Sequence, residues 1–73
     1  PSIQWTMELE GMMCEHCEAT VKKALESVPG VREALPDYKT GLVQLTLHFE
    51  ADTQALIAAV EKEEYPVLRL DKG

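Results

Sequence analysis

Cys14 and Cys17 are the two residues of this chain whose types and spacing most clearly suggest a chemistry. They lie in the segment Met12–Cys17, which reads MMCEHC, and the chain has no other cysteine. Thiolates are soft ligands that suit Cu(I) and Zn(II). Two sulfurs can complete a linear Cu(I) site, whereas Zn(II) prefers four ligands in a tetrahedron. The pair therefore favours an open, low-coordinate site for one soft metal ion over a closed structural zinc site.

The same pair has a second interpretation, as the redox dithiol of a thiol-disulfide oxidoreductase. A thioredoxin-like protein needs a longer chain with more strands, so metal binding is the preferred interpretation. A disulfide between Cys14 and Cys17 would close a very small loop and would restrict the unfolded chain little. We therefore expect reduced thiols and a cytoplasmic location.

Composition limits the classes of partner. The chain has 73 residues, with 13 acidic against 7 basic side chains and a formal net charge of −6. This acidic balance argues against binding to nucleic acid or to anionic lipid. No apolar run approaches the roughly 20 residues that cross a bilayer, and the N-terminus lacks the basic leader of a signal peptide. We expect one domain, residues 1–73, without direct membrane insertion.

The first half of the chain predicts a strand, a loop and a helix. Apolar residues alternate with polar ones from Ile3 to Leu9, which is typical of a half-buried strand. The helix is expected to begin near Glu15 or His16. Its apolar stripe consists of Cys17, Val21, Ala24, Leu25 and Val28. An exposed ion pair between Glu18 and Lys22 is expected, and Pro29-Gly30 should end the helix.

The second half repeats this order after one additional strand. Residues 31–38 form a weaker strand that Pro36 confines to a sheet edge, followed by a turn at Gly41. A clear strand alternates from Val43 to Phe49. Asp52 is expected to cap a helix from Thr53 to Glu64, and a short strand follows at 67–70. The chain is therefore predicted to be an α+β protein with the ferredoxin-like βαββαβ order. It should have a four-stranded antiparallel sheet, two helices on one face, and the second and fourth strands at the edges.

In this context the segment Gly11–Cys17, GMMCEHC, resembles the GMxCxxC loop of the heavy-metal-associated domain family. The family comprises small copper chaperones and the N-terminal metal-binding domains of metal-transporting P-type ATPases. The likeness extends over nearly the whole chain, including Pro29-Gly30-Val31 and Tyr65. It implies Cu(I) held by Cys14 and Cys17 and passed to a P-type ATPase domain by thiolate exchange. One departure from the commonest pattern is Glu64, where many relatives have glycine.

Four residues near the thiols have alternative roles. His16 is a third-ligand candidate for a divalent ion, but a solvated side chain is the preferred interpretation. Met12 is expected to pack beneath the loop rather than to bind metal, since methionine fills irregular gaps. The resemblance places Tyr65 beside the metal loop, where contact with the ligands and simple packing are about equally favoured. The role of Met13 is open, and we expect its side chain to be exposed.

The favoured function is a Cu(I) chaperone that is not an enzyme. It would act as a monomer, or as a metal-bridged dimer when a second copy supplies sulfur. The alternatives left open are an N-terminal domain of a metal-transporting ATPase and a protein that handles Zn(II), Cd(II) or Hg(II).

Overall fold

The structure is a computed structural model that describes residues 2–72. Six elements follow one another in the chain: β1 (Ile3–Leu9), α1 (Glu15–Glu26), β2 (Val31–Asp37), β3 (Leu42–Leu47), α2 (Thr53–Glu61) and β4 (Val67–Asp71). This is the predicted strand–helix–strand–strand–helix–strand order, and the predicted α+β fold is confirmed. Among residues 2–72, neither helix has the length and apolar composition that a membrane span requires.

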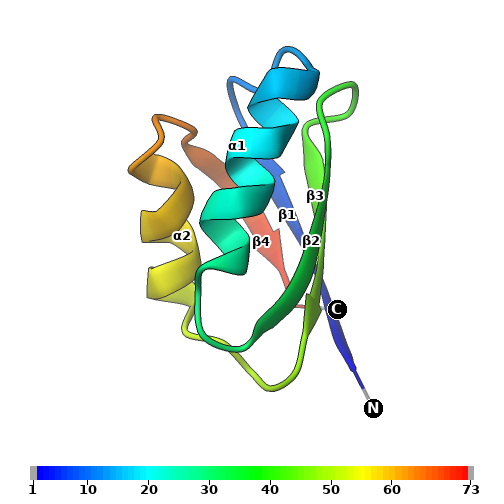
Figure 1. Cartoon of the computed structure of the whole chain (residues 1–73), viewed down its shortest axis with the longest axis vertical. Coiled ribbons are helices and arrows are strands. Elements are labelled where there is room, and N and C mark those ends of the chain that lie inside the picture. The colour runs from blue at the N-terminus through cyan, green and yellow to red at the C-terminus, as the bar shows by residue number, and fades with distance from the viewer. Residues whose placement is uncertain (1, 73) are drawn as a thin grey trace.

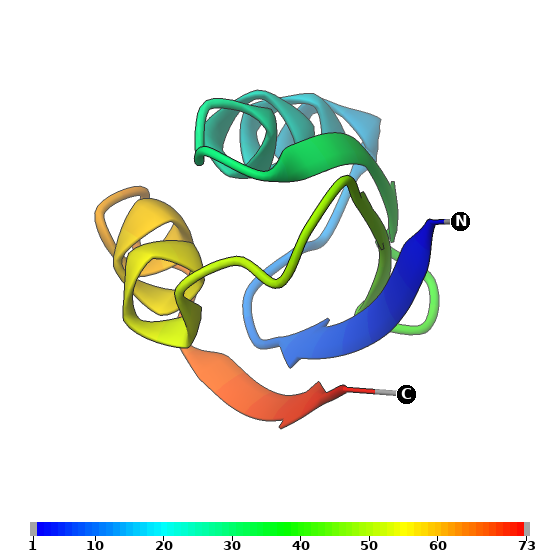
Figure 2. The same ribbon diagram turned by 90° about the horizontal axis from the view of Figure 1, so that it is seen from below.

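The strands form one antiparallel sheet in the order β2-β3-β1-β4, so β2 and β4 lie at its edges as predicted. Pro36 is in β2 opposite Val43, on an edge strand where its missing N–H is tolerated. Both helices cover the same face of the sheet (Figure 2). The core lies between these two layers and is formed by inward residues of all six elements.

Side chains of α1 hydrogen-bond to the backbone of the edge strand β2. The Lys22 Nζ donates to the Ala34 carbonyl at 3.0 Å, and Glu26 Oε2 accepts from the Ala34 N–H at 3.2 Å. Glu18 Oε2 accepts from the N–H of Tyr38 at 2.7 Å. These bonds satisfy backbone groups that an edge strand would otherwise leave open to other chains. They also hold α1 against this edge of the sheet.

The prediction of an ion pair between Glu18 and Lys22 is therefore wrong. Lys22 instead pairs with Glu26 at 2.7 Å, while Glu18 is drawn to the backbone of Tyr38. Both acidic side chains have a tertiary partner that a pattern within one helix does not reveal. The Lys22 ammonium, helped by the Ala34 N–H, lowers the pKa of Glu26.

The second helix ends at Glu61, three residues before the predicted end at Glu64. Its last turn closes with two bonds: the Tyr65 N–H donates to the Val60 carbonyl and the Glu64 N–H donates to the Glu61 carbonyl, both at 3.0 Å. Glu64 has a φ of 71°. This is a Schellman turn, in which the residue of positive φ is usually glycine. The turn reverses the chain and directs Tyr65 back over the molecule.

The start of α2 agrees with the prediction, whereas the end of β3 does not. Asp52 caps α2 as expected, accepting from the Gln54 N–H at 2.9 Å. Phe49 was expected to continue β3, but the strand ends at Leu47 and the Phe49 side chain is 56% exposed. Its ring packs against Gly30, where a Cβ would lie 2.8 Å from the Phe49 Cε1. The Phe49 ring therefore occupies the volume that a side chain at position 30 would fill.

Candidate metal site

Three connections meet at one end of the molecule: the β1–α1 loop, the β2–β3 turn and the α2–β4 turn (Figure 1). Backbone hydrogen bonds join them. The Leu9 N–H donates to the Gly41 carbonyl at 2.8 Å, and the Glu10 N–H donates to the Pro66 carbonyl at 3.0 Å. The β1–α1 loop, which contains the cysteines, therefore leaves a strand that is fixed on both sides.

The chain leaves β1 through Gly11, whose φ of 97° favours glycine. Next to it, Met12 turns inward and is only 7% exposed within the core. The ring of Tyr65 lies beside Gly11, since a Cβ at Gly11 would be 3.5 Å from the Tyr65 Cδ1. The loop is thus anchored from below by Met12 and bordered by Tyr65.

The two thiols lie at the start of α1. Cys14 is the residue before the helix, with extended backbone, and its carbonyl accepts from the N–H groups of Cys17 at 3.0 Å and Glu18 at 3.2 Å. This turn brings the two Sγ atoms to 3.6 Å from one another. Cys14 is exposed and Cys17 is half-buried. Both are free thiols at the surface, where one ion could bridge them.

The surroundings of Cys17 favour its thiolate. A hydrogen bond from the Met13 backbone N–H is the largest cause that lowers the pKa of Cys17 from 9.0 to about 7. Bonds from the Tyr65 hydroxyl and the Cys14 thiol follow, while partial burial opposes the shift. Because it donates to Cys17 and is partly buried, the Tyr65 hydroxyl has its pKa raised to about 12. At neutral pH, Cys17 is therefore prepared to act as an anionic sulfur ligand.

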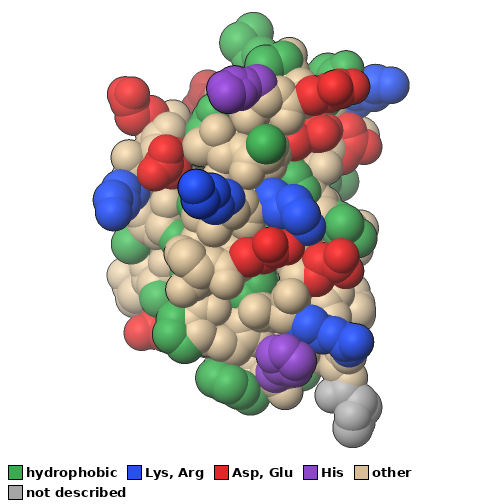
Figure 3. Space-filling model, in the orientation of Figure 1, with side chains coloured by type: hydrophobic (Ala, Val, Ile, Leu, Met, Phe, Trp, Pro, Cys, Tyr) green, Lys and Arg blue, Asp and Glu red, His purple; other side chains and the backbone are tan. Residues whose placement is uncertain are grey.

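The remaining residues of the segment point outward. Met13 is 81% exposed, and Glu15 and His16 are exposed in the first turn of α1. In Figure 3 the tip of the molecule carries apolar, histidine and acidic side chains above the start of α1. Within residues 2–72, no three side chains of the types His, Cys, Asp and Glu gather into a metal-binding cluster. The exposure of His16 agrees with the preferred interpretation of a solvated side chain, and a role as third ligand for a divalent ion stays the alternative.

Sequence reasoning identified the two thiols, Met12 as a core residue and Tyr65 as a neighbour of the loop. It did not find the bond from the Met13 N–H to Cys17, because a backbone group carries no signal in residue type. It also left the direction of the Cys17 pKa open, since Glu15 and Glu18 in the first turn oppose the helix start. The loop backbone and the Tyr65 hydroxyl decide that direction.

Comparison with known proteins gives consistent results. The chain matches the heavy-metal-associated domain over residues 6–66. It is 44% identical over 61 residues to a mercuric reductase of Acidithiobacillus ferrooxidans, covering 84% of this chain and 11% of the relative. It is 39% identical over 57 residues to copper-transporting ATPase 2 of Rhizobium meliloti (strain 1021), covering 78% of this chain and 7% of the relative.

Among solved structures, the CopZ metallochaperone superposes with a TM-score of 0.76 and 28% sequence identity, covering 89% of this chain and 98% of that one. The chain spans only 10–14% of the length of the mercuric reductases that it matches. The likeness to those enzymes is thus confined to a small part of each. From its family match and its fold, the chain belongs to the heavy-metal-associated domain family.

Proposed function

We propose that residues 1–73 act as one heavy-metal-associated domain that carries Cu(I) in the cytoplasm and delivers it to a metal-transporting P-type ATPase. Cys14 and Cys17 would hold the ion. The observation that carries this proposal is the pair of free Sγ atoms, 3.6 Å apart, on a loop at the tip of the molecule. The copper-transporting ATPase relative and the CopZ neighbour support the choice of cargo and partner.

The sulfur separation is compatible with a low-coordinate ion after a small movement. With metal–sulfur bonds of about 2.3 Å, sulfurs at 3.6 Å subtend an angle of about 100° at the metal. A linear arrangement would need a separation of about 4.6 Å with the same bonds, so the thiols would have to open by about 1 Å. The exposed Cys14 side chain, which makes no helix-capping hydrogen bond, is free to make this movement.

An open site also allows transfer by ligand exchange. A thiolate of the partner forms a new bond to Cu(I), and then one of the two cysteine sulfurs releases the ion. The metal keeps its oxidation state, and the released sulfur remains a thiolate until it takes a proton from water. Because the pKa of Cys17 is lowered to about 7, about half of this sulfur is already thiolate at neutral pH.

Mercury is the second candidate cargo, because mercuric reductases are among the relatives with more than 40% identity. Hg(II) is also a soft ion that two thiolates can hold, so binding alone does not separate the two metals. Transfer of the ion to an acceptor domain can distinguish them. A copper chaperone should transfer Cu(I) to the N-terminal domain of a copper-transporting ATPase faster than a soluble chelator can intercept it.

The test has two parts. Anaerobic Cu(I) titration against a competing chelator should give one ion per chain for the wild-type protein and none for the Cys14→Ser, Cys17→Ser double variant. Equal binding by the double variant would end the proposal. The loaded protein is then mixed with the ATPase domain in the presence of excess chelator. Transfer of Hg(II) but not of Cu(I) to its respective acceptor domain would replace copper by mercury as the cargo.

A further inference from the structure

We infer that Met13 is a third sulfur donor to the bound Cu(I), a thioether that covers the open side of the site and leaves when a partner thiolate arrives. The inference rests on the proposed function, because it concerns the same ion. It assigns a role to the one methionine whose side chain is not part of the core. The chain has three methionines, and Met7 and Met12 are both buried.

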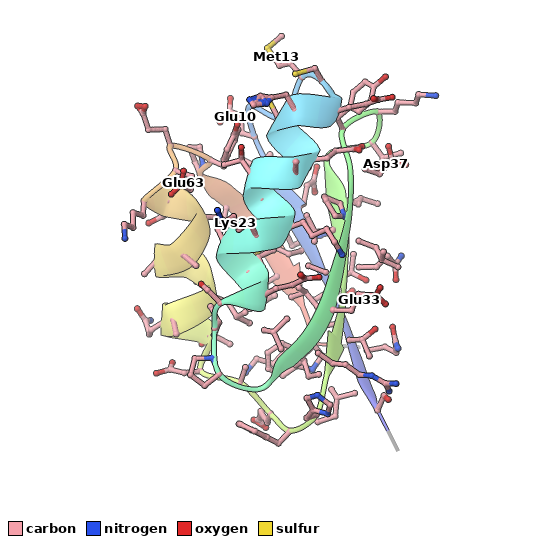
Figure 4. The ribbon with its side chains drawn as sticks, in the orientation of Figure 1. Glu10, Met13, Lys23, Glu33, Asp37 and Glu63 are labelled. Atoms are coloured by element: carbon pink, nitrogen blue, oxygen red, sulfur yellow. The ribbon has the colours of Figure 1, made fainter. Side chains whose placement is uncertain are left out.

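Exposure of Met13 is the first observation. Its side chain is 81% exposed, against 7% for Met12 and 0% for Met7. Figure 4 shows it projecting from the tip of the molecule, away from both helices. An exposed side chain of this kind contributes little to the hydrophobic core. Single exposed apolar residues are common, so exposure alone assigns no role.

The position of Met13 is the second observation. It directly precedes Cys14, the residue before α1, and Cys17 lies in the first turn of that helix. Consecutive Cα atoms across a trans peptide are about 3.8 Å apart, and no cis peptide is present in residues 2–72. Met13 thus lies next to the turn that brings the two Sγ atoms together. We expect rotation about its three flexible side-chain bonds to bring the thioether to the metal.

The chemistry of a thioether fits a temporary ligand. Two thiolates and Cu(I) carry a net charge of −1, and a neutral thioether leaves that charge unchanged, whereas a third thiolate would add another negative charge. Thioethers are soft donors that favour Cu(I). Zn(II), which is bound through thiolate, imidazole and carboxylate, gains little from one. On transfer, the Cu–S bond to Met13 breaks as the bond to the partner sulfur forms, and no proton or electron moves.

Met13 could alternatively be an apolar contact for the partner protein, since methionine is frequent on adaptable binding surfaces. The substitution Met13→Leu separates the two roles, because leucine keeps the apolar side chain and lacks the sulfur. Met7→Leu is the matched control. It removes a sulfur from the buried face of β1 rather than from the metal loop, and a swap of similar volume in the core is tolerated.

The experiment uses protein labelled with ¹³C at the methionine methyl groups. One equivalent of Cu(I) should move the Met13 methyl signal more than those of Met7 and Met12. Met13→Leu should weaken Cu(I) binding by about tenfold, the lower end of the range for changes around metal ligands. Zn(II) binding by that variant, and Cu(I) binding by Met7→Leu, should not change.

An unmoved Met13 signal in protein that holds Cu(I) through its two cysteines would overturn this inference and leave the proposed function intact. So would equal Cu(I) affinity in wild-type and Met13→Leu protein. If Cu(I) affinity is equal and the Met13→Leu variant nevertheless transfers Cu(I) more slowly, Met13 is an apolar contact for the partner protein and not a metal ligand. Retention of Cu(I) by the Cys14→Ser, Cys17→Ser variant would overturn the proposed function itself.

Discussion

The reactivity of Cys17 should depend on the Tyr65 hydroxyl, and the change Tyr65→Phe tests this. The experiment is made in a Cys14→Ser background, so that Cys17 is the single thiol and position 14 keeps a hydroxyl that can donate to it. The rate of reaction with a small aromatic disulfide is measured from pH 5 to 11, for folded protein and for protein in urea. The thiolate is the reacting species in both states.

The expected rates follow from the pKa of Cys17. At pH 7 a thiol with a pKa of about 7 is half ionised, and one at 9.0 is about 1% ionised, a ratio of about 50. The lower pKa also makes the thiolate a weaker nucleophile, by about eightfold for a Brønsted coefficient near 0.45. Folded protein should therefore react about sixfold faster than unfolded protein at pH 7, and about sevenfold more slowly at pH 10.

Tyr65→Phe removes the second of the causes that lower this pKa and leaves the Met13 N–H in place. The midpoint of the rate profile should rise above 7 and remain below 9.0. The two curves for folded and unfolded protein should still cross. A midpoint at 9.0 in the folded parent protein, or an identical profile in the Tyr65→Phe variant, would refute the reasoning about the hydrogen bonds to Cys17.

Three further predictions concern stability and can be measured by urea denaturation. Glu64→Gly should raise the free energy of unfolding by about 0.5–1 kcal/mol, because the φ of 71° at position 64 strains any residue but glycine. The matched control Glu63→Gly should lower the free energy of unfolding by a similar amount. Gly30→Ala should lower it by more than about 1 kcal/mol, since the new Cβ would lie 2.8 Å from the Phe49 ring at a φ of 96°. Finally, stability should rise from pH 7 to 9 and be lost as pH falls through 7, because unfolded Cys17 keeps a proton that the folded thiol has released. Cys17→Ser should remove that dependence, and its persistence would assign it to another group.

Much of the fold could be predicted because local pattern and tertiary structure agree. The alternation in β1 and β3, the Asp52 cap and the edge position of Pro36 are each decided by a few adjacent residues. The prediction errors occur where a group far away in the chain determines the partner of a side chain or the end of a helix. Glu18 binds a backbone N–H twenty residues away. The helix α2 ends early although Glu64 is a good helix former, because Tyr65 packs back toward the loop.

The candidate site divides in the same way. The residue types of Cys14 and Cys17 and their spacing are visible in the sequence, and so is the break at Gly11. The contacts that prepare Cys17 come from the backbone of Met13 and from Tyr65, which lies 48 positions away in the chain. Only the folded structure shows that these groups meet, whereas the burial of Met12 and the exposure of Met13 agree with the sequence prediction.

X-ray absorption spectroscopy of the protein loaded with one equivalent of Cu(I) tests the central claim most directly. We predict that copper is surrounded by sulfur alone, with two thiolates from Cys14 and Cys17 and a longer contact that disappears in Met13→Leu. Nitrogen or oxygen neighbours from His16 or Glu15, or an unchanged spectrum in the Cys14→Ser, Cys17→Ser variant, would contradict the account.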